Sequence, residues 1–143
     1  MKKIIAVIGI AILVFSTGSM ARDDIGKYQV QPLLETDKAK KALFDIPLYF
    51  GTQEHPASKE KYGEVMTNKK TNATWKSDQE ACEWAMLSAL KALQARAKKE
   101  GMNAVVNIQS YYKKREFISE TEFECGAGTI MAGVTLKGTL VKI

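Results

Sequence analysis

The chain has 143 residues, of which 45% are hydrophobic, and it carries 21 basic against 16 acidic residues. This length accommodates one domain of ordinary size behind a short leader. The basic residues are spread along the chain instead of forming one basic cluster, and two of them belong to the leader, which disfavours a nucleic-acid-binding protein.

The first 21 residues have the pattern of a secretory signal peptide. Lys2 and Lys3 precede an apolar run over residues 4–15, which falls in the usual range of roughly 7–15 residues. Ala21 is a small residue at the expected cleavage position, so cleavage is predicted before Arg22. The apolar run is shorter than the ~20 residues that cross a bilayer, so no stable membrane anchor is expected after cleavage.

The segments before residue 77 are predicted to be short and mostly irregular. Residues 22–34 are polar without periodicity and are predicted to form an arm before the core. Residues 36–43 suit a short helical turn, and the apolar residues 42–50 suit a strand that Pro47 restricts to an edge position. Residues 51–62 have the composition of a surface loop, whereas residues 63–71 begin with the alternation of a strand.

A long helix is predicted to begin after Ser77 and to end at Gly101. Ser77 and Glu80 have the spacing of a capping box, and glycine is the residue that most readily takes the left-handed conformation of a helix C-cap. Acidic residues lie near the start and lysines near the end, as the helix dipole favours. A stripe with helical spacing is predicted to face the core: Cys82, Ala85, Met86, Ala89, Leu93 and Ala97.

Two or three strands are predicted after the helix. The first, from Ala104 onward, is expected to place Ala104, Val106, Ile108, Ser110 and Tyr112 on one face. After a charged turn over residues 113–116, the next strand covers residues 117–125 and ends in a loop with Gly126 and Gly128. Its alternation places Phe117, Thr121, Phe123 and Cys125 on one side and Glu120, Glu122 and Glu124 on the other. A last strand covers residues 130–140, and these neighbours are most simply antiparallel.

The two cysteines, Cys82 and Cys125, are predicted to form one disulfide in an oxidising compartment. Closing a loop of about 44 residues stabilises the fold by roughly 4 kcal/mol on the chain-entropy model. A redox-active pair is the weaker interpretation, because the Cys-x-x-Cys spacing that tunes such chemistry is missing.

Candidate binding residues are few. Trp75 and Trp84 either cover one end of the core or belong to a ligand pocket or an interaction surface. The acidic ladder of Glu120, Glu122 and Glu124 is interpreted as an exposed strand face kept soluble by like charges, with binding of a cation or a basic partner as the alternative. His55 is a lone loop histidine without an evident partner, so it is predicted to be solvated rather than catalytic.

The turn Gly-Met-Asn-Ala-Val-Val-Asn-Ile over residues 101–108, followed by hairpins and a glycine-bearing run over residues 133–140, resembles a known superfamily. It is similar to the small α/β superfamily of the Rcs stress-sensor lipoproteins and the YbjQ-like domains, and the similarity covers residues 63–140. The resemblance implies that the turn links the main helix to a central strand. In the Rcs sensor a helix cysteine is bridged to a cysteine on a later strand, and Cys82 and Cys125 are similarly placed.

The chain departs from that superfamily in ways that affect function. It has no lipidated cysteine and no proline-rich tether, and it has one bridge where the Rcs sensor has two. The YbjQ-like domains have been proposed to bind heavy metals, but this chain offers a single histidine and two sulfurs that are predicted to be oxidised. No metal site and no cofactor are predicted.

Together these features predict a cleaved signal peptide over residues 1–21 and a single α+β domain over residues 22–143. One long helix is expected to pack on a mostly antiparallel sheet of four to five strands with a single disulfide. No catalytic set is recognisable, so we expect an exported, periplasmic or secreted, non-enzymatic protein that binds an envelope or secreted partner, in cell-envelope homeostasis or stress response. The alternative is a periplasmic domain that binds a small ligand or a divalent metal.

Overall fold

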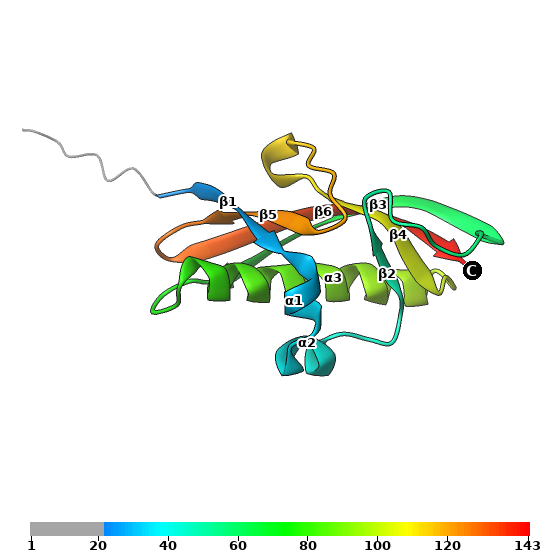
Figure 1. The fold of residues 1–143 in the computed structure, drawn as a ribbon, viewed down its shortest axis with the longest axis horizontal. Coiled ribbons are helices and arrows are strands. Elements are labelled where there is room, and N and C mark those ends of the chain that lie inside the picture. Colours follow the sequence, from blue (N-terminus) through cyan, green and yellow to red (C-terminus); the bar gives the residue numbers. More distant parts are fainter. Residues whose placement is uncertain (1–21) are drawn as a thin grey trace, which may run out of the picture.

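The computed structural model describes residues 22–143, so the predicted signal peptide lies outside the described residues. Six strands form one sheet in the order β1-β5-β6-β4-β2, and β3 pairs with β6. The helix α3 covers one face of this sheet (Figure 1). The elements are β1 (Asp24–Gln29), α1 (Val30–Leu34), α2 (Asp37–Ala42), β2 (Leu48–Phe50), β3 (Glu60–Asn72), α3 (Asp78–Lys99), β4 (Ala104–Ser110), the 3-10 helix η1 (Tyr112–Lys114), β5 (Glu122–Ala127) and β6 (Met131–Lys142). The predicted α+β fold is confirmed, with one strand more than expected.

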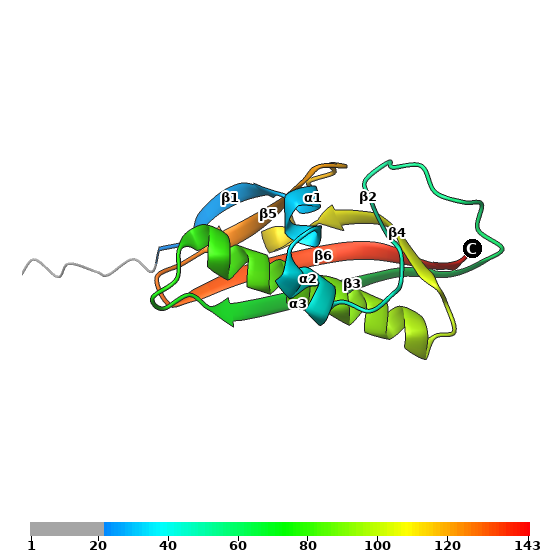
Figure 2. The ribbon, with the colours of Figure 1, turned by 60° about the horizontal axis from the view of Figure 1, so that its bottom comes forward.

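Strand β6 is the centre of the sheet. On one side it pairs antiparallel with β3 along its whole length. On the other side it pairs first with β5 and then with β4, also antiparallel. Only β2 runs parallel to its neighbour, β4. Strand β3 therefore has a partner strand on one side only, and α3 runs alongside it (Figure 2).

The boundaries of α3 agree with the capping residues that the sequence predicts. The Ser77 hydroxyl accepts a hydrogen bond of 3.1 Å from the Glu80 N–H. At the other end Gly101 has a φ of 74°. The Met102 N–H donates to the Ala97 carbonyl at 2.8 Å and the Gly101 N–H to the Lys98 carbonyl at 3.2 Å. These two bonds form a Schellman motif, which satisfies carbonyls that the helix end leaves unpaired.

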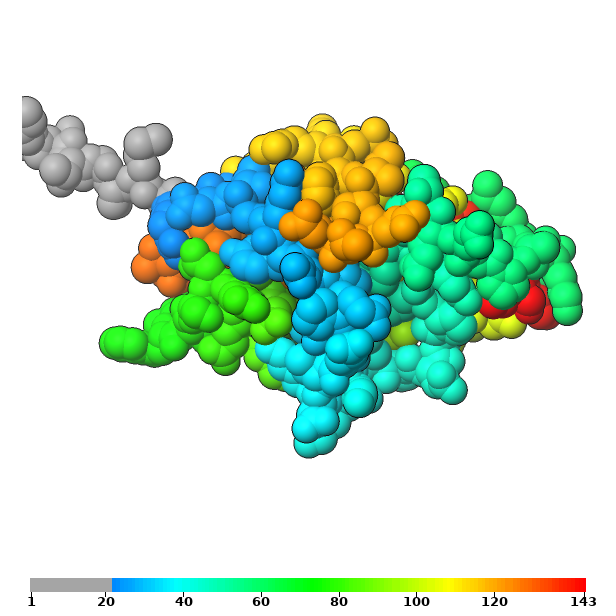
Figure 3. Space-filling view, viewed as in Figure 1, coloured from blue at the N-terminus to red at the C-terminus, as the bar shows by residue number. Residues whose placement is uncertain are grey.

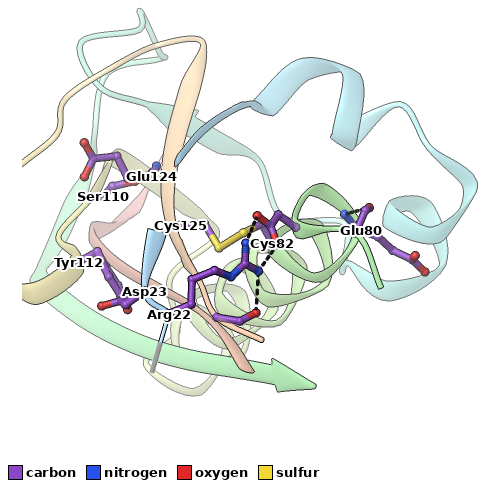
Figure 4. The surroundings of a disulfide bond; sticks show 11 residues. Arg22, Asp23, Glu80, Cys82, Ser110, Tyr112, Glu124 and Cys125 are labelled. Atoms are coloured by element: carbon purple, nitrogen blue, oxygen red, sulfur yellow. Dashed lines mark hydrogen bonds and ion pairs between the residues drawn. A yellow bond between two sulfur atoms is a disulfide. The ribbon is translucent and has the colours of Figure 1, made fainter. Parts of the chain in front are cut away.

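The core lies between α3 and the sheet. All six residues of the predicted helical stripe are buried there, and they pack with Val134, Leu136 and Leu140 of β6. The disulfide between Cys82 of α3 and Cys125 of β5 is formed, with the two Cα atoms 5.8 Å apart (Figure 4). The predicted link between helix and sheet is thus confirmed.

The opposite, outer face of the sheet is covered by the chain between β4 and β5 (Figure 3, yellow to orange). Tyr112 lies so close to Gly126 that a Cβ atom at that position would overlap the phenol ring. The Tyr112 hydroxyl donates a hydrogen bond of 2.9 Å to Asp23, and Lys113 forms an ion pair with the same carboxylate. These contacts fix the covering segment to the start of β1.

The predicted arm over residues 22–34 is wrong. Its first half is β1, which pairs antiparallel with β5, and its second half is the short helix α1. Val30 and Leu33 are buried in the core. The segment shows little periodicity because most of β1 is exposed, and its strand conformation depends on main-chain bonds to β5, about 100 residues away in the sequence.

Two predicted strands are longer than the observed ones. Of residues 42–50 only Leu48–Phe50 form a strand, at the sheet edge as Pro47 requires. Residues 44–46 are instead bound by Gln94 of α3, whose amide donates to the carbonyls of Phe44 and Ile46 and accepts from the Phe44 N–H. The strand predicted over residues 117–125 begins only at Glu122 and includes Gly126, which was expected in a loop.

The predicted alternation of β4 is also wrong, because Asn107 has a positive φ of 52° and the pairing with β6 is irregular there. The extra residue of a bulge shifts the following side chains to the other face. Ile108 consequently joins Val105 in the core beneath α3, while Ala104 and Val106 belong to a separate small cluster with Val141. The helical turn predicted over residues 36–43 is confirmed as α2.

Candidate functional site

A groove runs between the free edge of β3 and α3. It consists of two hollows of about 450 and 370 Å³ that share Lys69, Ala92 and Ala95 in their walls. Strand β3 forms one side of the groove, α3 forms the floor, and Phe44 closes the second hollow. We call this feature the β3–α3 groove.

Small side chains form the floor of the β3–α3 groove. Ser88, Ala92 and Ala95 lie on α3 at spacings of four and three residues, which places them on one side of the helix. They are adjacent to the stripe that packs into the core, and neither Ser88 nor Ala95 is covered by another element. Because these side chains are short, the helix surface beside β3 is open enough to accept another chain segment.

The groove is bordered by basic residues. Lys69 and Lys70 come from β3, whereas Lys91, Arg96 and Lys99 come from α3, and no carboxylate contributes to the walls of the two hollows. The Tyr62 hydroxyl and the Glu100 carboxylate bind Arg96 and raise its pKa above the ordinary value. In the part of the chain that the structure describes, none of the four lysines forms an ion pair within 4 Å. The charge of Lys70 contributes to the lowered pKa of Asp23, whereas Lys69, Lys91 and Lys99 remain available to a ligand.

A second, smaller pocket of about 210 Å³ lies on the outer face of the sheet, where Ile118 of the covering segment forms one wall. Its other walls are mostly polar and include Glu64, Asn107, Gln109 and Thr139. The Gln109 Oε1 atom is buried and accepts no hydrogen bond from any described residue. A buried acceptor without a donor is uncommon in folded proteins.

The three glutamates predicted to form an acidic ladder do not form one. Glu120 precedes β5 and accepts a hydrogen bond of 2.9 Å from Thr52, and Glu122 is half-buried. Glu124 is only 3% exposed, with Arg115 3.9 Å from one of its carboxylate oxygens. Figure 4 shows its side chain pointing away from the disulfide, which lies on the other side of β5. The interpretation as an exposed solubilising face is therefore wrong for Glu124.

The two tryptophans do not line the β3–α3 groove. Trp75 is 100% exposed and has a φ of 65°, so it covers no part of the core. It follows β3, whose neighbouring residue Ala73 donates a hydrogen bond to the carbonyl of exposed Ile130. Trp84 is 36% exposed on α3, with the Lys38 ammonium 5.2 Å above its ring. The expectation that they cover one end of the core is wrong for Trp75.

Other candidate chemistry is sparse in residues 22–143. The His55 ring faces the Pro56 carbonyl at 2.8 Å and lies 5.6 Å from the Tyr49 ring. Within these residues, no three His, Cys, Asp or Glu side chains converge as metal ligands would. None of the described helices is both long and apolar enough to cross a membrane.

Comparison with protein-family models, with curated proteins and with solved structures finds no match to this chain. The β3–α3 groove was not predicted from the sequence. Its sequence signal is the second row of small residues on α3, Ser88, Ala92 and Ala95, beside the core stripe. The free edge of β3, by contrast, follows from strand order, which no local pattern encodes.

Proposed function

We propose that this protein is an exported, non-enzymatic binding protein that holds a polypeptide partner in the β3–α3 groove. The observation that carries the proposal is a long strand with one unpaired edge next to an open, basic helix surface. Exposed strand edges are normally shortened or covered, because they associate with other chains. An edge of 13 residues beside an uncovered groove is the arrangement of a recognition surface.

Export is supported by the signal-peptide pattern and by the Cys82–Cys125 disulfide, since disulfides persist in oxidising compartments. Absence of a recognisable nucleophile and base in the sequence supports a binding role over an enzymatic one. A role in cell-envelope homeostasis or stress response rests on the resemblance to the Rcs and YbjQ-like superfamily.

Site-specific crosslinking in intact cells tests this function. A photoreactive amino acid at position 95, in the groove floor, should give discrete crosslinked species that the same group at exposed Lys114 of η1 does not give. Lys114 lies in the segment that covers the outer face of the sheet, opposite α3, so position 114 controls for random collisions. Identical crosslinks from both positions, or none from position 95, would exclude a partner in the groove.

The second candidate function is binding of a small polar ligand in the outer-face pocket. The unpartnered Gln109 Oε1 atom favours it, because a ligand with a hydrogen-bond donor would satisfy this buried acceptor. Calorimetric titration with monosaccharides, amino acids and divalent cations would detect such binding. A specific ligand should bind more weakly to the Gln109→Met and Glu64→Gln variants, and a heat signal that neither variant changes would argue against this pocket.

A further inference from the structure

The main-chain groups of β3 that face the free edge can be assigned residue by residue. The Ala73 N–H donates to the Ile130 carbonyl at 2.6 Å, and the register between β3 and β6 is regular from Gly63 to Asn72. In an antiparallel ladder the residues that bond to the neighbouring strand alternate with those that do not. Met66, Asn68 and Lys70 therefore point their N–H and C=O groups away from β6, toward solvent.

A strand placed on this edge would lie over α3 rather than in open solvent. The walls of the β3–α3 groove come from both β3 and α3, so α3 extends beneath the unpaired edge. A seventh strand would be about 4.8 Å from β3. Every second side chain of that strand would point toward α3, where the short side chains of Ser88, Ala92 and Ala95 leave room and lysines lie at the border.

The charges around the groove determine which segment it favours. Lys69, Lys70, Lys91 and Lys99 border it, and no carboxylate lies in its walls. We propose that the free edge of β3 accepts an extended acidic segment of another polypeptide as a seventh strand. The carboxylates on its α3-facing side lie among Lys69, Lys91 and Lys99, and the alternate side chains lie on the outer face beside Lys70. This inference rests on the proposed function and specifies the partner and the binding mode.

A second copy of this chain is a poorer occupant of the edge. Pairing β3 with β3 of another molecule would bring two lysine-bordered grooves together, and like charges placed side by side are unfavourable. Lysines on edge strands commonly prevent this association between copies. The same charges attract a partner of opposite sign, so the edge rejects its own copy and remains available to an acidic segment.

Defined peptides test the proposal on the purified residues 22–143. The probes are a capped eight-residue peptide of alternating Glu and Val, its counterpart with Lys in place of Glu, and a Glu–Val peptide N-methylated at adjacent central residues. One of two adjacent N-methyl groups faces β3 whichever direction the added strand takes. Fluorescence anisotropy should show binding of the first peptide that weakens as the salt concentration rises. The lysine peptide and the N-methylated peptide should bind about tenfold more weakly or not at all, because one lacks the charge and the other lacks main-chain donors.

Variants of the protein separate the contribution of main-chain pairing to peptide binding from the contribution of charge. Asn68→Pro removes one outward N–H without breaking a bond to β6. It should therefore lower the affinity for the Glu–Val peptide about tenfold, whereas Asn68→Ala should leave this affinity unchanged. The Lys69→Glu/Lys91→Glu double variant should lower this affinity at least as much, and Lys114→Glu on the outer face serves as the charge control. Amide hydrogen exchange at Met66, Asn68 and Lys70 should slow when the peptide is bound.

The outcomes distinguish this inference from the proposed function. Equal binding of the Glu–Val and Lys–Val peptides, or of the methylated and unmethylated ones, would overturn strand addition by an acidic segment. If the crosslinks from position 95 persist in Asn68→Pro and in Lys69→Glu/Lys91→Glu, the groove binds a partner in another way. A concentration-dependent dimer that Asn68→Pro dissociates would show that a second copy occupies the edge.

Discussion

Tyr112 shows how one side chain links the covering segment to the rest of the domain. Its ring packs on Gly126, where any larger residue would displace it, and its hydroxyl donates to Asp23. Burial, followed by this hydrogen bond, raises the pKa of Tyr112 to about 12. Lys113, followed by Tyr112, lowers the pKa of Asp23 below its ordinary value.

These two pKa shifts predict opposite pH dependences of the folding stability. Tyr112 keeps its proton to higher pH in the folded protein than in the unfolded chain, whose tyrosine pKa is ~10. Its contribution to stability is therefore present below pH ~10 and is lost as the pH rises through about 12. Asp23 has a lowered pKa, so its contribution is present at neutral pH and is lost as the pH falls through the folded-state pKa.

An ultraviolet titration of tyrosinate measures this effect directly. One tyrosine should ionise near pH 12, and Tyr112→Phe should remove that transition. In Asp23→Asn the pKa of Tyr112 should fall but remain above ~10, because burial is the larger cause of the shift. An unchanged transition in Asp23→Asn would show that the hydrogen bond to Asp23 does not affect the phenol.

Gly101 is the residue on which the end of α3 depends. Its φ of 74° is available to glycine and costs other residues roughly 1–2 kcal/mol. Gly101→Val should therefore lower the free energy of unfolding by about that amount in urea denaturation. Gly101→Asn should lower the free energy of unfolding by less, since asparagine tolerates this conformation better than valine does. Equal stability of the valine variant and the wild type would contradict the left-handed cap.

At the level of elements, Gln94 fixes the irregular segment between α2 and β2 to α3. Its side chain is 1% exposed and forms three hydrogen bonds with the main chain of Phe44 and Ile46. This role explains a polar residue within the buried face of α3. It also explains why residues 43–47 are ordered without forming the predicted strand.

Replacing Gln94 by methionine tests this attachment, because methionine has a similar volume but no hydrogen-bonding groups. We expect a loss of about 1–3 kcal/mol in the free energy of unfolding, with faster hydrogen exchange at the Phe44 amide. Gln31→Met is the matched control, since the Gln31 side chain is exposed on α1 and bonds to Glu35 on the surface. If both variants lost the same stability, the buried hydrogen bonds of Gln94 would not be responsible.

For the whole molecule, the disulfide is the strongest single constraint on the unfolded chain. Cys82 and Cys125 are fully buried and 43 residues apart in sequence. The double variant Cys82→Ala/Cys125→Ala should lose roughly 4 kcal/mol, which corresponds to a melting temperature about 12–20 °C lower for a domain of this size. A thiol assay should find no free thiol in the unreduced wild type. A melting temperature of the double variant only a degree or two below that of the oxidised wild type would contradict a stabilising bridge.

Features that depend on neighbouring residues can be predicted from the sequence alone. The capping residues, the periodic stripe and Gly101 define α3, because each acts within a turn or two of helix. Alternation along residues 130–140 defines most of β6, and two cysteines allow only one pairing. These local patterns were sufficient to predict the fold class, the core face of the helix and the disulfide.

Features that depend on distant residues are set by contacts in the folded molecule. β1 forms because β5 supplies its hydrogen bonds, and Glu124 is buried because residues between β4 and β5 cover the outer face. The bulge at Asn107 redirects β4, and the strand order leaves one edge of β3 unpaired above α3. Periodicity cannot encode these outcomes, since each is set by contacts between segments far apart in the chain. The β3–α3 groove is one of them, which is why the candidate binding surface became visible only in the folded molecule.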